Sequence, residues 1–209
     1  MRTVSQLQGY WDDVHRQKHL GALSGCSYAE TIFFLQVKDI LKKGDKVLEI
    51  GVGLGYVTQG FKENGINVSA LDISQVALNR VRDYCEKLYI VDKISELPDN
   101  CFDVIICQNG IQHIPTYLLE IELPHLIRSL KPTGVFAMEF VSSQIAEDTG
   151  KDFNSDIKWD ESIGCYCRTP AFLEKLINNF GGNCKLVYDY HGDIEPYIKG
   201  CHIFHITKR

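Results

Sequence analysis

The sequence predicts an α/β fold built on a seven-stranded, doubly wound and mostly parallel sheet. Short apolar, β-branched segments alternate with segments of helical periodicity along most of the chain, and this alternation is typical of strands joined by crossover helices. A turn with glycines at positions 51, 53 and 55 follows the first of these strands. Glycine-rich turns between a strand and a helix let the backbone approach a nucleotide-like ligand. The fold is therefore expected to carry a ligand site at its first strand.

The first half of the chain reads as three strands with helices between them. A helix over residues 29–41 shows apolar residues at helical spacing and stops at Lys43-Gly44, before a strand over 46–50. A helix over 56–63 ends at Asn64-Gly65, and a second strand follows over 67–71. Ser74 is suited to the N-cap position of a helix that reaches about residue 84. A third strand is expected over 88–91.

The second half supplies four more strands. The strand over 103–107 is apolar on both sides, as a central parallel strand should be. A helix over 117–130 ends where Pro132 forbids its continuation, and a strand over 135–140 follows. Thr169-Pro170 is suited to begin a helix that reaches residue 180. The last two strands are expected over 184–188 and 202–207.

Length and charge indicate the organisation of the chain and its partners. The 209 residues fit one domain of ordinary size, residues 1–209. A net charge of −5 with scattered Lys and Arg disfavours a nucleic-acid partner. No apolar run approaches the roughly 20 residues that cross a bilayer, and the first ten residues hold no signal-peptide block. We therefore expect a cytoplasmic protein with no membrane partner, of an oligomeric state that the sequence does not indicate.

Eight cysteines raise the question of disulfides or a metal site. None forms a C-x-x-C pair, and Cys165 and Cys167 lack a second pair at zinc spacing. His15 and His19 stand four residues apart, a spacing that could in principle bind a metal on a helix. We expect reduced thiols and no metal.

The glycine turn and the strand after it carry the chemistry. Glu49 precedes the turn, and Asp72 ends the next strand, where a carboxylate can accept both ribose hydroxyls of an adenosine ligand. A dinucleotide fingerprint would need a third glycine at position 56, which is Tyr56. The spacing therefore favours an adenosine ligand other than a nicotinamide dinucleotide.

These residues resemble the class I S-adenosylmethionine-dependent methyltransferases, whose first motif has an acid followed by alternate glycines. The matching positions are Glu49, Gly51, Gly53, Gly55, Asp72, Leu97-Pro98, Phe102-Asp103 and the segment 130–134. The resemblance implies a Rossmann-like sheet in the order 3-2-1-4-5-7-6 with the last strand antiparallel. It also implies S-adenosyl-L-methionine as cofactor and S-adenosyl-L-homocysteine as product.

The resemblance extends the expected cofactor site to other strand ends. In this family the loop after the third strand supplies an acid for the adenine amino group, and Asp92 is the nearest match. Ile94 is the alternative, packing on the adenine ring. The region after the fourth strand borders the methionine part of the cofactor. The additional cofactor-binding candidates are Ile73, Asp92, Ile94, Gln108 and Asn109.

His113 and Glu139 are the catalytic candidates. Methyl transfer mainly requires the acceptor to be aligned with the methyl group, but a hydroxyl acceptor must also lose a proton. The reference pKa of histidine, roughly 6.5, suits a base, and Glu139 near the end of the fifth strand is the second candidate. The alternative for His113 is a structural role, capping the next helix or packing against the loop.

Two segments fall outside the strand and helix rhythm, 1–27 and 141–168. We expect the first to be an N-terminal cap in which Tyr10 and Trp11 contribute an aromatic wall for the cofactor; the alternative is an amphipathic helix docked on the sheet edge. We expect the second to cover the substrate, the alternative being a solvated acidic loop.

The function expected from the resemblance is methylation of an oxygen or nitrogen of a small polar metabolite, such as a sugar or a precursor of a surface or secondary product. Methylation of a protein is one alternative. A non-catalytic scaffold that binds S-adenosylmethionine is another, because a fold alone does not establish chemistry.

Overall fold

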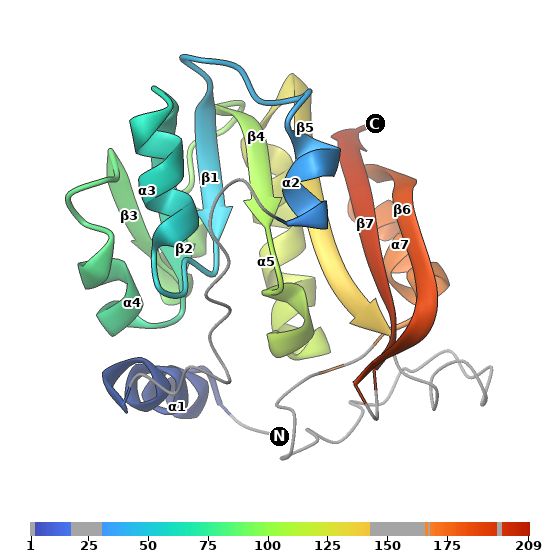
Figure 1. Cartoon of the computed structure of the whole chain (residues 1–209), viewed down its shortest axis with the longest axis horizontal. Coiled ribbons are helices and arrows are strands. Elements are labelled where there is room, and N and C mark those ends of the chain that lie inside the picture. Colours follow the sequence, from blue (N-terminus) through green and yellow to red (C-terminus); the bar gives the residue numbers. More distant parts are fainter. Residues whose placement is uncertain (1–2, 18–30, 143–165, 167, 196–197) are drawn as a thin grey trace.

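The computed structural model describes residues 3–17, 31–142, 166, 168–195 and 198–209. Its seven strands form one sheet in the order β3-β2-β1-β4-β5-β7-β6 (Figure 1). The strand bounds are β1 Lys46–Ile50, β2 Asn67–Asp72, β3 Lys87–Ile90, β4 Phe102–Cys107, β5 Leu130–Ser142, β6 Gly182–Glu195 and β7 Ile198–Lys208. β1 to β5 pair in parallel, and β7 runs antiparallel to both β5 and β6. The predicted strand order and the antiparallel last strand are confirmed.

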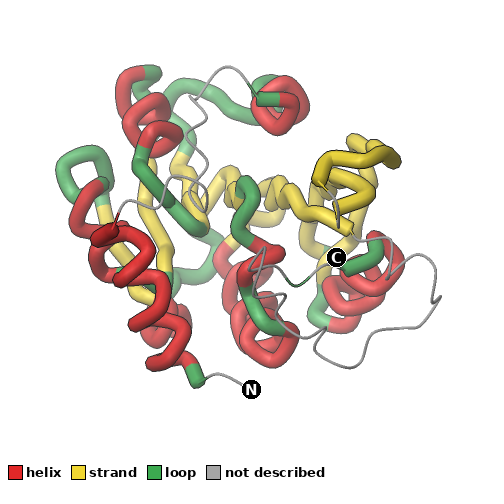
Figure 2. Tube along the Cα trace, turned by 60° about the horizontal axis from the view of Figure 1, so that its bottom comes forward, coloured by secondary structure: helices red, strands yellow, loops and turns green. Residues whose placement is uncertain are grey.

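Helices cover both faces of the sheet, as Figure 2 shows. The described helices are α1 Val4–Gln17, α2 Ile32–Val37, α3 Tyr56–Glu63, α4 Gln75–Arg80, α5 Thr116–Ser129 and α7 Pro170–Asn179, with 3-10 turns η1 Val91–Glu96 and η2 Ile111–His113. The largest buried cluster joins α5 and α7 to one face of the sheet, and a second joins α2 and α3 to the other. Successive strand residues point to opposite faces, so the near-continuous apolar strands fill both clusters.

Side-chain caps begin three of the helices. The hydroxyls of Thr31, Ser74 and Thr169 each accept a hydrogen bond from the backbone N–H three residues later. Such a cap contributes about 1 kcal/mol. The cap positions expected at Ser74 and Thr169 are therefore confirmed.

Several element boundaries differ from the expected ones. α4 ends at Arg80, four residues early, because Val81 leaves the helical region with φ −97° and ψ 4°. β5 begins at Leu130, which pairs with Phe102 before an irregularity in the register. The segment with Pro132 lies within this irregularity, between the Leu130 pair and the continuous pairing that begins at Val135. The strand therefore starts five residues before the predicted start at residue 135.

The carboxyl ends of the parallel strands meet along one edge of the sheet, at the bottom of Figure 1. α1 lies below this edge and packs against α4. Leu7 of α1 is fully buried in the largest core cluster. This contact anchors the N-terminal helix at the edge where open α/β sheets bind ligands.

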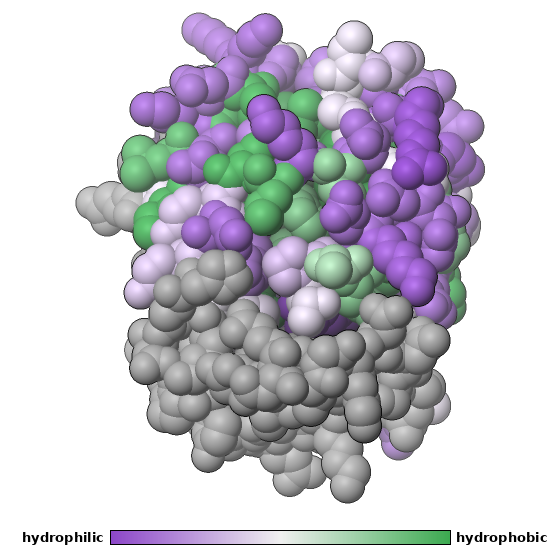
Figure 3. Space-filling model, turned by 90° about the vertical axis from the view of Figure 1, so that its right-hand side faces the viewer, coloured by the Kyte–Doolittle hydropathy of each residue, from purple (hydrophilic) through white to green (hydrophobic). Residues whose placement is uncertain are grey.

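The surface near β6 is partly apolar. Figure 3 shows that face, with apolar side chains gathered on the upper left and hydrophilic ones on the right. Exposed large apolar residues of the flanking elements include Ile32 and Leu35 of α2 and Leu186 and Tyr190 of β6. Among the helices of the described residues, none has the length and apolar character to cross a membrane.

Candidate functional site

The glycine turn after β1 has a backbone that side chains disfavour. Gly51, Gly53 and Gly55 have φ values of +73°, +54° and +86°, in the left-handed region that glycine adopts most readily. A Cβ on Gly55 would lie 2.7 Å from a methyl carbon of Val81, whereas a Cβ on Gly53 would meet no atom within 4 Å. Gly55 is thus required by packing, and Gly53 faces open space in which a ligand fits.

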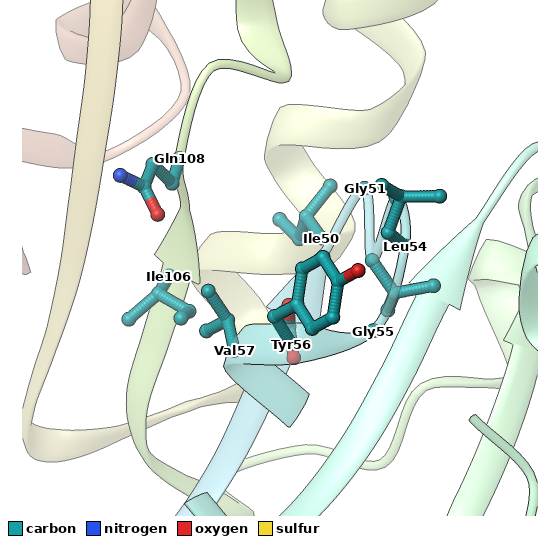
Figure 4. Close-up of a pocket in the computed structure, with 11 residues that line it drawn as sticks. Ile50, Gly51, Leu54, Gly55, Tyr56, Val57, Ile106 and Gln108 are labelled. Atoms are coloured by element: carbon teal, nitrogen blue, oxygen red, sulfur yellow. The ribbon is translucent and has the colours of Figure 1, made fainter. Parts of the chain in front are cut away.

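A pocket opens beside this turn. It is lined by Glu49, Ile50, Gly51, Val52, Gly53, Leu54, Gly55, Tyr56, Val57, Ile106 and Gln108. In Figure 4 the glycine turn, Tyr56 and Val57 lie on one side, and Ile106 and Gln108 lie on the other. The pocket therefore spans the carboxyl ends of β1 and β4, which is the topological switch point where ligands bind in such sheets.

Glu49 is buried under the turn. Its carboxyl accepts a 2.7 Å hydrogen bond from the Thr58 hydroxyl of α3. Burial raises the pKa of Glu49 to about 8, and the hydrogen bond from Thr58 opposes this rise. Glu49 therefore joins the strand before the turn to the helix after it, while also lining the pocket.

Asp72 holds the neighbouring loops together at the end of β2. One carboxyl oxygen accepts from the backbone N–H of Val52 at 2.9 Å, and the other accepts from that of Ser74 at 2.8 Å. Burial raises the pKa of Asp72 to about 6, against the effect of these hydrogen bonds. Each carboxylate oxygen has a second lone pair, so Asp72 can accept ribose hydroxyls as well.

The structure places Tyr10 and Trp11 at the site. The Trp11 ring packs edge-on against the His113 ring, with centroids 4.9 Å apart, and Tyr10 packs against Trp11. Leu54 of the turn and Ile73 pack against the same small cluster. α1 thus covers the strand ends with aromatic side chains, and the part of the N-terminal segment beyond Gln17, with His19, lies outside the described residues until Thr31.

Two side chains that the sequence analysis missed connect α1 to the glycine turn. Asp12 accepts hydrogen bonds from the Ser74 hydroxyl at 2.6 Å and the Val76 N–H at 3.2 Å. Arg80 donates to the carbonyl of Gly53 at 2.9 Å and to that of His15 at 3.2 Å. Asp12 and Arg80 could not be recognised from the sequence, since the groups that they bind lie more than twenty residues away along the chain.

His15 is part of this connection rather than of a recognisable metal site. Its ring is buried, and burial together with the Arg80 charge lowers its pKa to about 4. Within the described ranges, no three His, Cys, Asp or Glu side chains gather as a metal-ion site. The described cysteines, at positions 85, 101, 107, 184 and 201, are free thiols.

The segment after β4 bends sharply beside the pocket. Asn109 has φ +51°, which is uncommon outside glycine and is often found at functional sites. Gln108 donates to the Thr31 hydroxyl at 3.0 Å, and Gln112 donates to the Asn109 side chain at 3.2 Å. The other polar atom of Gln112, its amide oxygen, is buried without a hydrogen-bond partner.

Glu139 of β5 lies next to this bend. One carboxyl oxygen accepts from the Cys201 thiol at 3.6 Å, and the backbone N–H of Asn109 also faces the carboxyl. The second oxygen, Oε2, is buried and has no hydrogen-bond partner within the described part of the chain. Burial raises the pKa of Glu139 to about 7. His113 and Glu139, far apart in sequence, therefore both lie at the loop after β4.

Arg168 is another residue that sequence reasoning missed. Its buried guanidinium donates to the carbonyls of Ile111 and Ile114, and the backbone N–H of Tyr166 donates to the carbonyl of Gln112. The end of the segment 141–168 is thus anchored on η2, which carries His113. The remainder of the predicted covering loop, residues 143–165 and 167, lies outside the described residues.

The two adenine candidates differ in their surroundings. Asp92 is exposed on η1, at the end of β3. Ile94 is buried in the largest core cluster, so its side chain faces the sheet. Contact of either residue with an adenine ring stays a prediction.

Residues 48–138, from β1 to β5, match the family model described as "Methyltransferase domain". This matched segment, somewhat less than half of the chain, contains the glycine turn and Asp72 and is similar to the methyltransferase domain. Phosphoethanolamine N-methyltransferase 2 of Caenorhabditis elegans is 29% identical over 138 residues, 62% of this chain and 31% of the relative. A ubiquinone biosynthesis O-methyltransferase of Rickettsia typhi is 28% identical over 107 residues, 48% of this chain and 42% of the relative. The chain thus aligns with less than half the length of these curated relatives.

Solved structures share the fold of this chain. Magnesium protoporphyrin IX methyltransferase of Synechocystis, with bound S-adenosylhomocysteine, has a TM-score of 0.68 at 14% identity, covering 99% of this chain and all of that one. The [4+2]-cyclase SpnF has a TM-score of 0.74 at 17% identity, covering 99% and 97%. A cyclase with this fold illustrates that the fold does not decide the reaction. The reaction must be argued from the site.

The residues of this chain fit S-adenosylmethionine. Gly53 leaves open space where a Cβ would project, and the Asp72 carboxylate stands at the end of the adjacent strand. The pocket reaches Gln108, the first residue after β4. The approach of the methionine part to the two catalytic candidates stays a prediction.

Proposed function

We propose that this methyltransferase transfers a methyl group from S-adenosylmethionine to an oxygen or nitrogen of a small polar metabolite. The observation that carries the proposal is a buried carboxyl, Glu139, with an unpartnered oxygen beside the loop that follows β4. Curated relatives named as N- and O-methyltransferases of small molecules support the acceptor class.

The residues divide the work between binding and alignment. When bound, S-adenosylmethionine supplies a methyl group on a positively charged sulfur. The glycine turn and Asp72 would hold its adenosine, with Ile73, Asp92 and Ile94 as further adenine-side candidates, and Gln108 and Asn109 would border its methionine part. α1, through Tyr10 and Trp11, excludes water from the strand ends.

Glu139 and His113 are the proposed proton acceptors. A base works best when its pKa lies near the working pH, and the pKa of Glu139, about 7, satisfies this condition. Its basic form is present above that pH, so turnover that depends on Glu139 should rise as the pH increases through about 7. His113 packs on Trp11 and is therefore positioned by the N-terminal helix.

The test is release of S-adenosylhomocysteine with a panel of small hydroxyl and amine acceptors. His113→Ala and Glu139→Ala should each keep the affinity for the cofactor, and the variant that removes the base should lose roughly a hundredfold in turnover or more. His125→Ala and Glu120→Ala, on α5, are matched controls that should turn over normally. If the protein binds the cofactor but both site variants keep full turnover, neither residue is the base.

A protein acceptor and a scaffold without catalysis are distinguished by the same assay. A scaffold would bind the cofactor and release no S-adenosylhomocysteine with any acceptor. A protein methyltransferase would act on a protein substrate and on no small molecule of the panel.

A further inference from the structure

Two buried oxygens that have no hydrogen-bond partner among the described residues flank one residue of the site. They are Oε1 of Gln112 and Oε2 of Glu139. Asn109 lies between them, since its side chain accepts from Gln112 and its backbone N–H faces the Glu139 carboxyl. Buried acceptors are nearly always satisfied, because an unsatisfied one loses its hydration without compensation. Two such atoms at one bend indicate that something else donates to them.

The charge of the surroundings restricts that donor. The described neighbours of the Glu139 carboxyl, the Cys201 thiol and the Asn109 N–H, are uncharged donors. No salt bridge to Glu139 is present among the described residues. Glu122 of α5 is a further acid in this region, since both it and Glu139 act on Cys107 of β4. The Glu139 carboxyl therefore has no cationic partner among the described residues, and a bound cation would supply one.

From this arrangement we infer that Gln112 and Glu139 form the acceptor subsite and that it binds a primary or secondary ammonium group. The inference rests on the proposed function and assigns its acceptor to the amine class. An ammonium group supplies several N–H donors, and its positive charge would give the buried Glu139 carboxylate a cationic partner. A phosphate or carboxylate supplies no donor and repels Glu139, so such groups of a substrate must lie elsewhere.

A bound ammonium also suits Glu139 chemically. The amine nitrogen passes its proton to the Oε2 oxygen, and the lone pair left on nitrogen forms the new bond to the methyl carbon as the carbon–sulfur bond breaks, with its electrons staying on sulfur. The product nitrogen keeps one positive charge, and the proton leaves Glu139 to solvent with the product. An alcohol would have to give its proton to the Glu139 carboxylate, which is a much weaker base than the alkoxide that would form. This disfavours an alcohol as the methyl acceptor.

The experiment compares paired probes on the protein saturated with S-adenosylhomocysteine. The set contains primary amines such as ethanolamine and 2-amino-1,3-propanediol, each paired with the alcohol in which hydroxyl replaces the amino group, ethylene glycol and glycerol, plus phenol. Ligand-observed saturation-transfer NMR at pH 8 measures binding, and labelled methyl from S-adenosylmethionine identifies the modified atom by mass spectrometry. The variants are Glu139→Gln and Gln112→Leu, with Glu120→Gln, an exposed residue of α5, as control.

The amines should bind at least tenfold more tightly than their alcohol partners. Glu139→Gln and Gln112→Leu should each reduce amine binding at least tenfold, and Glu120→Gln should not. Equal or tighter binding of the alcohols or phenol, methylation on oxygen only, or no amine binding to cofactor-saturated protein would overturn the amine assignment while leaving methyl transfer standing. Failure to bind S-adenosylhomocysteine in calorimetry would instead overturn the proposed function itself. The paired comparison uses the unaltered protein, so it holds even if a variant does not fold.

Discussion

Replacing Glu122 by glutamine should make the protein more stable at high pH. Glu122 lies on α5 with 1% of its surface exposed, and neither of its carboxyl oxygens has a hydrogen-bond partner in the described ranges. Burial alone raises its pKa to about 8 from a reference of 4.5. Glutamine has nearly the same shape and cannot ionise, so the substitution isolates the ionisation.

The sign and size follow from proton linkage. Between pH 4.5 and 8 the unfolded chain has released the Glu122 proton and the folded chain still holds it, so the free energy of unfolding falls as the pH rises. At about 1.36 kcal/mol for each pKa unit, the interval from 4.5 to about 8 corresponds to roughly 5 kcal/mol. Above pH 8 both states are ionised and this loss is complete.

Urea unfolding followed by circular dichroism at pH 5, 6.5 and 8.5 measures the effect. At pH 5 the difference in unfolding free energy between Glu122→Gln and the wild type should reflect only the replacement of a neutral carboxyl by an amide. By pH 8.5 the variant should have gained about 3–5 kcal/mol relative to the wild type. Glu120→Gln, two residues earlier and exposed, should show no such trend. A difference between Glu122→Gln and wild type that stays constant across the three pH values would refute the reasoning, because the carboxyl would then ionise as readily in the folded chain.

Two further substitutions test the cofactor site. Asp72→Asn should weaken S-adenosylhomocysteine binding about ten- to a hundredfold, since a charge-assisted hydrogen bond contributes about 1.5–3 kcal/mol. Calorimetry measures the affinity, with Asp83→Asn, at an exposed position, as the control. An unchanged affinity in a folded Asp72→Asn variant would argue against the ribose role. Arg80→Met should speed amide hydrogen exchange in residues 4–17, because it removes the donor to the His15 carbonyl of α1, which the same guanidinium joins to the Gly53 carbonyl; exchange at the wild-type rate would contradict that coupling.

The sheet could be predicted because its signals are local. Each strand and helix is marked by its own apolar period and by cap or stop residues near it in sequence, such as Ser74 and Pro132. The strand order came from the resemblance, which the glycine turn and Asp72 carry. The early end of α4 at Arg80 was missed because that helix boundary depends on backbone geometry at Val81 and has no distinctive residue.

The candidate site was predicted where the signal is a motif and missed where it is a pairing. Gly51, Gly53 and Gly55 stand in a recognisable spacing. Asp12 and Arg168, in contrast, act through backbone and hydroxyl groups that lie tens of residues away, and the identity of a backbone partner is not encoded in any residue type. Glu139 could be named as a candidate from its place at a strand end, but its unpartnered oxygen is visible only in three dimensions.

The four buried acids of the described residues differ in the hydrogen bonds that their carboxyls receive, and this difference separates their roles. The carboxyl of Asp72 has two backbone N–H donors and that of Glu49 has the Thr58 hydroxyl, so both already serve the loops that carry them. Glu122 and Glu139 both retain unpartnered oxygens. Glu122 lies on α5 with 1% of its surface exposed, whereas Glu139 stands on β5 with the backbone N–H of Asn109, in the loop after β4, facing its carboxyl. A ligand that donates to an unsatisfied carboxyl compensates for its lost hydration, and so the acceptor role that we propose for Glu139 would turn its burial into affinity for a substrate.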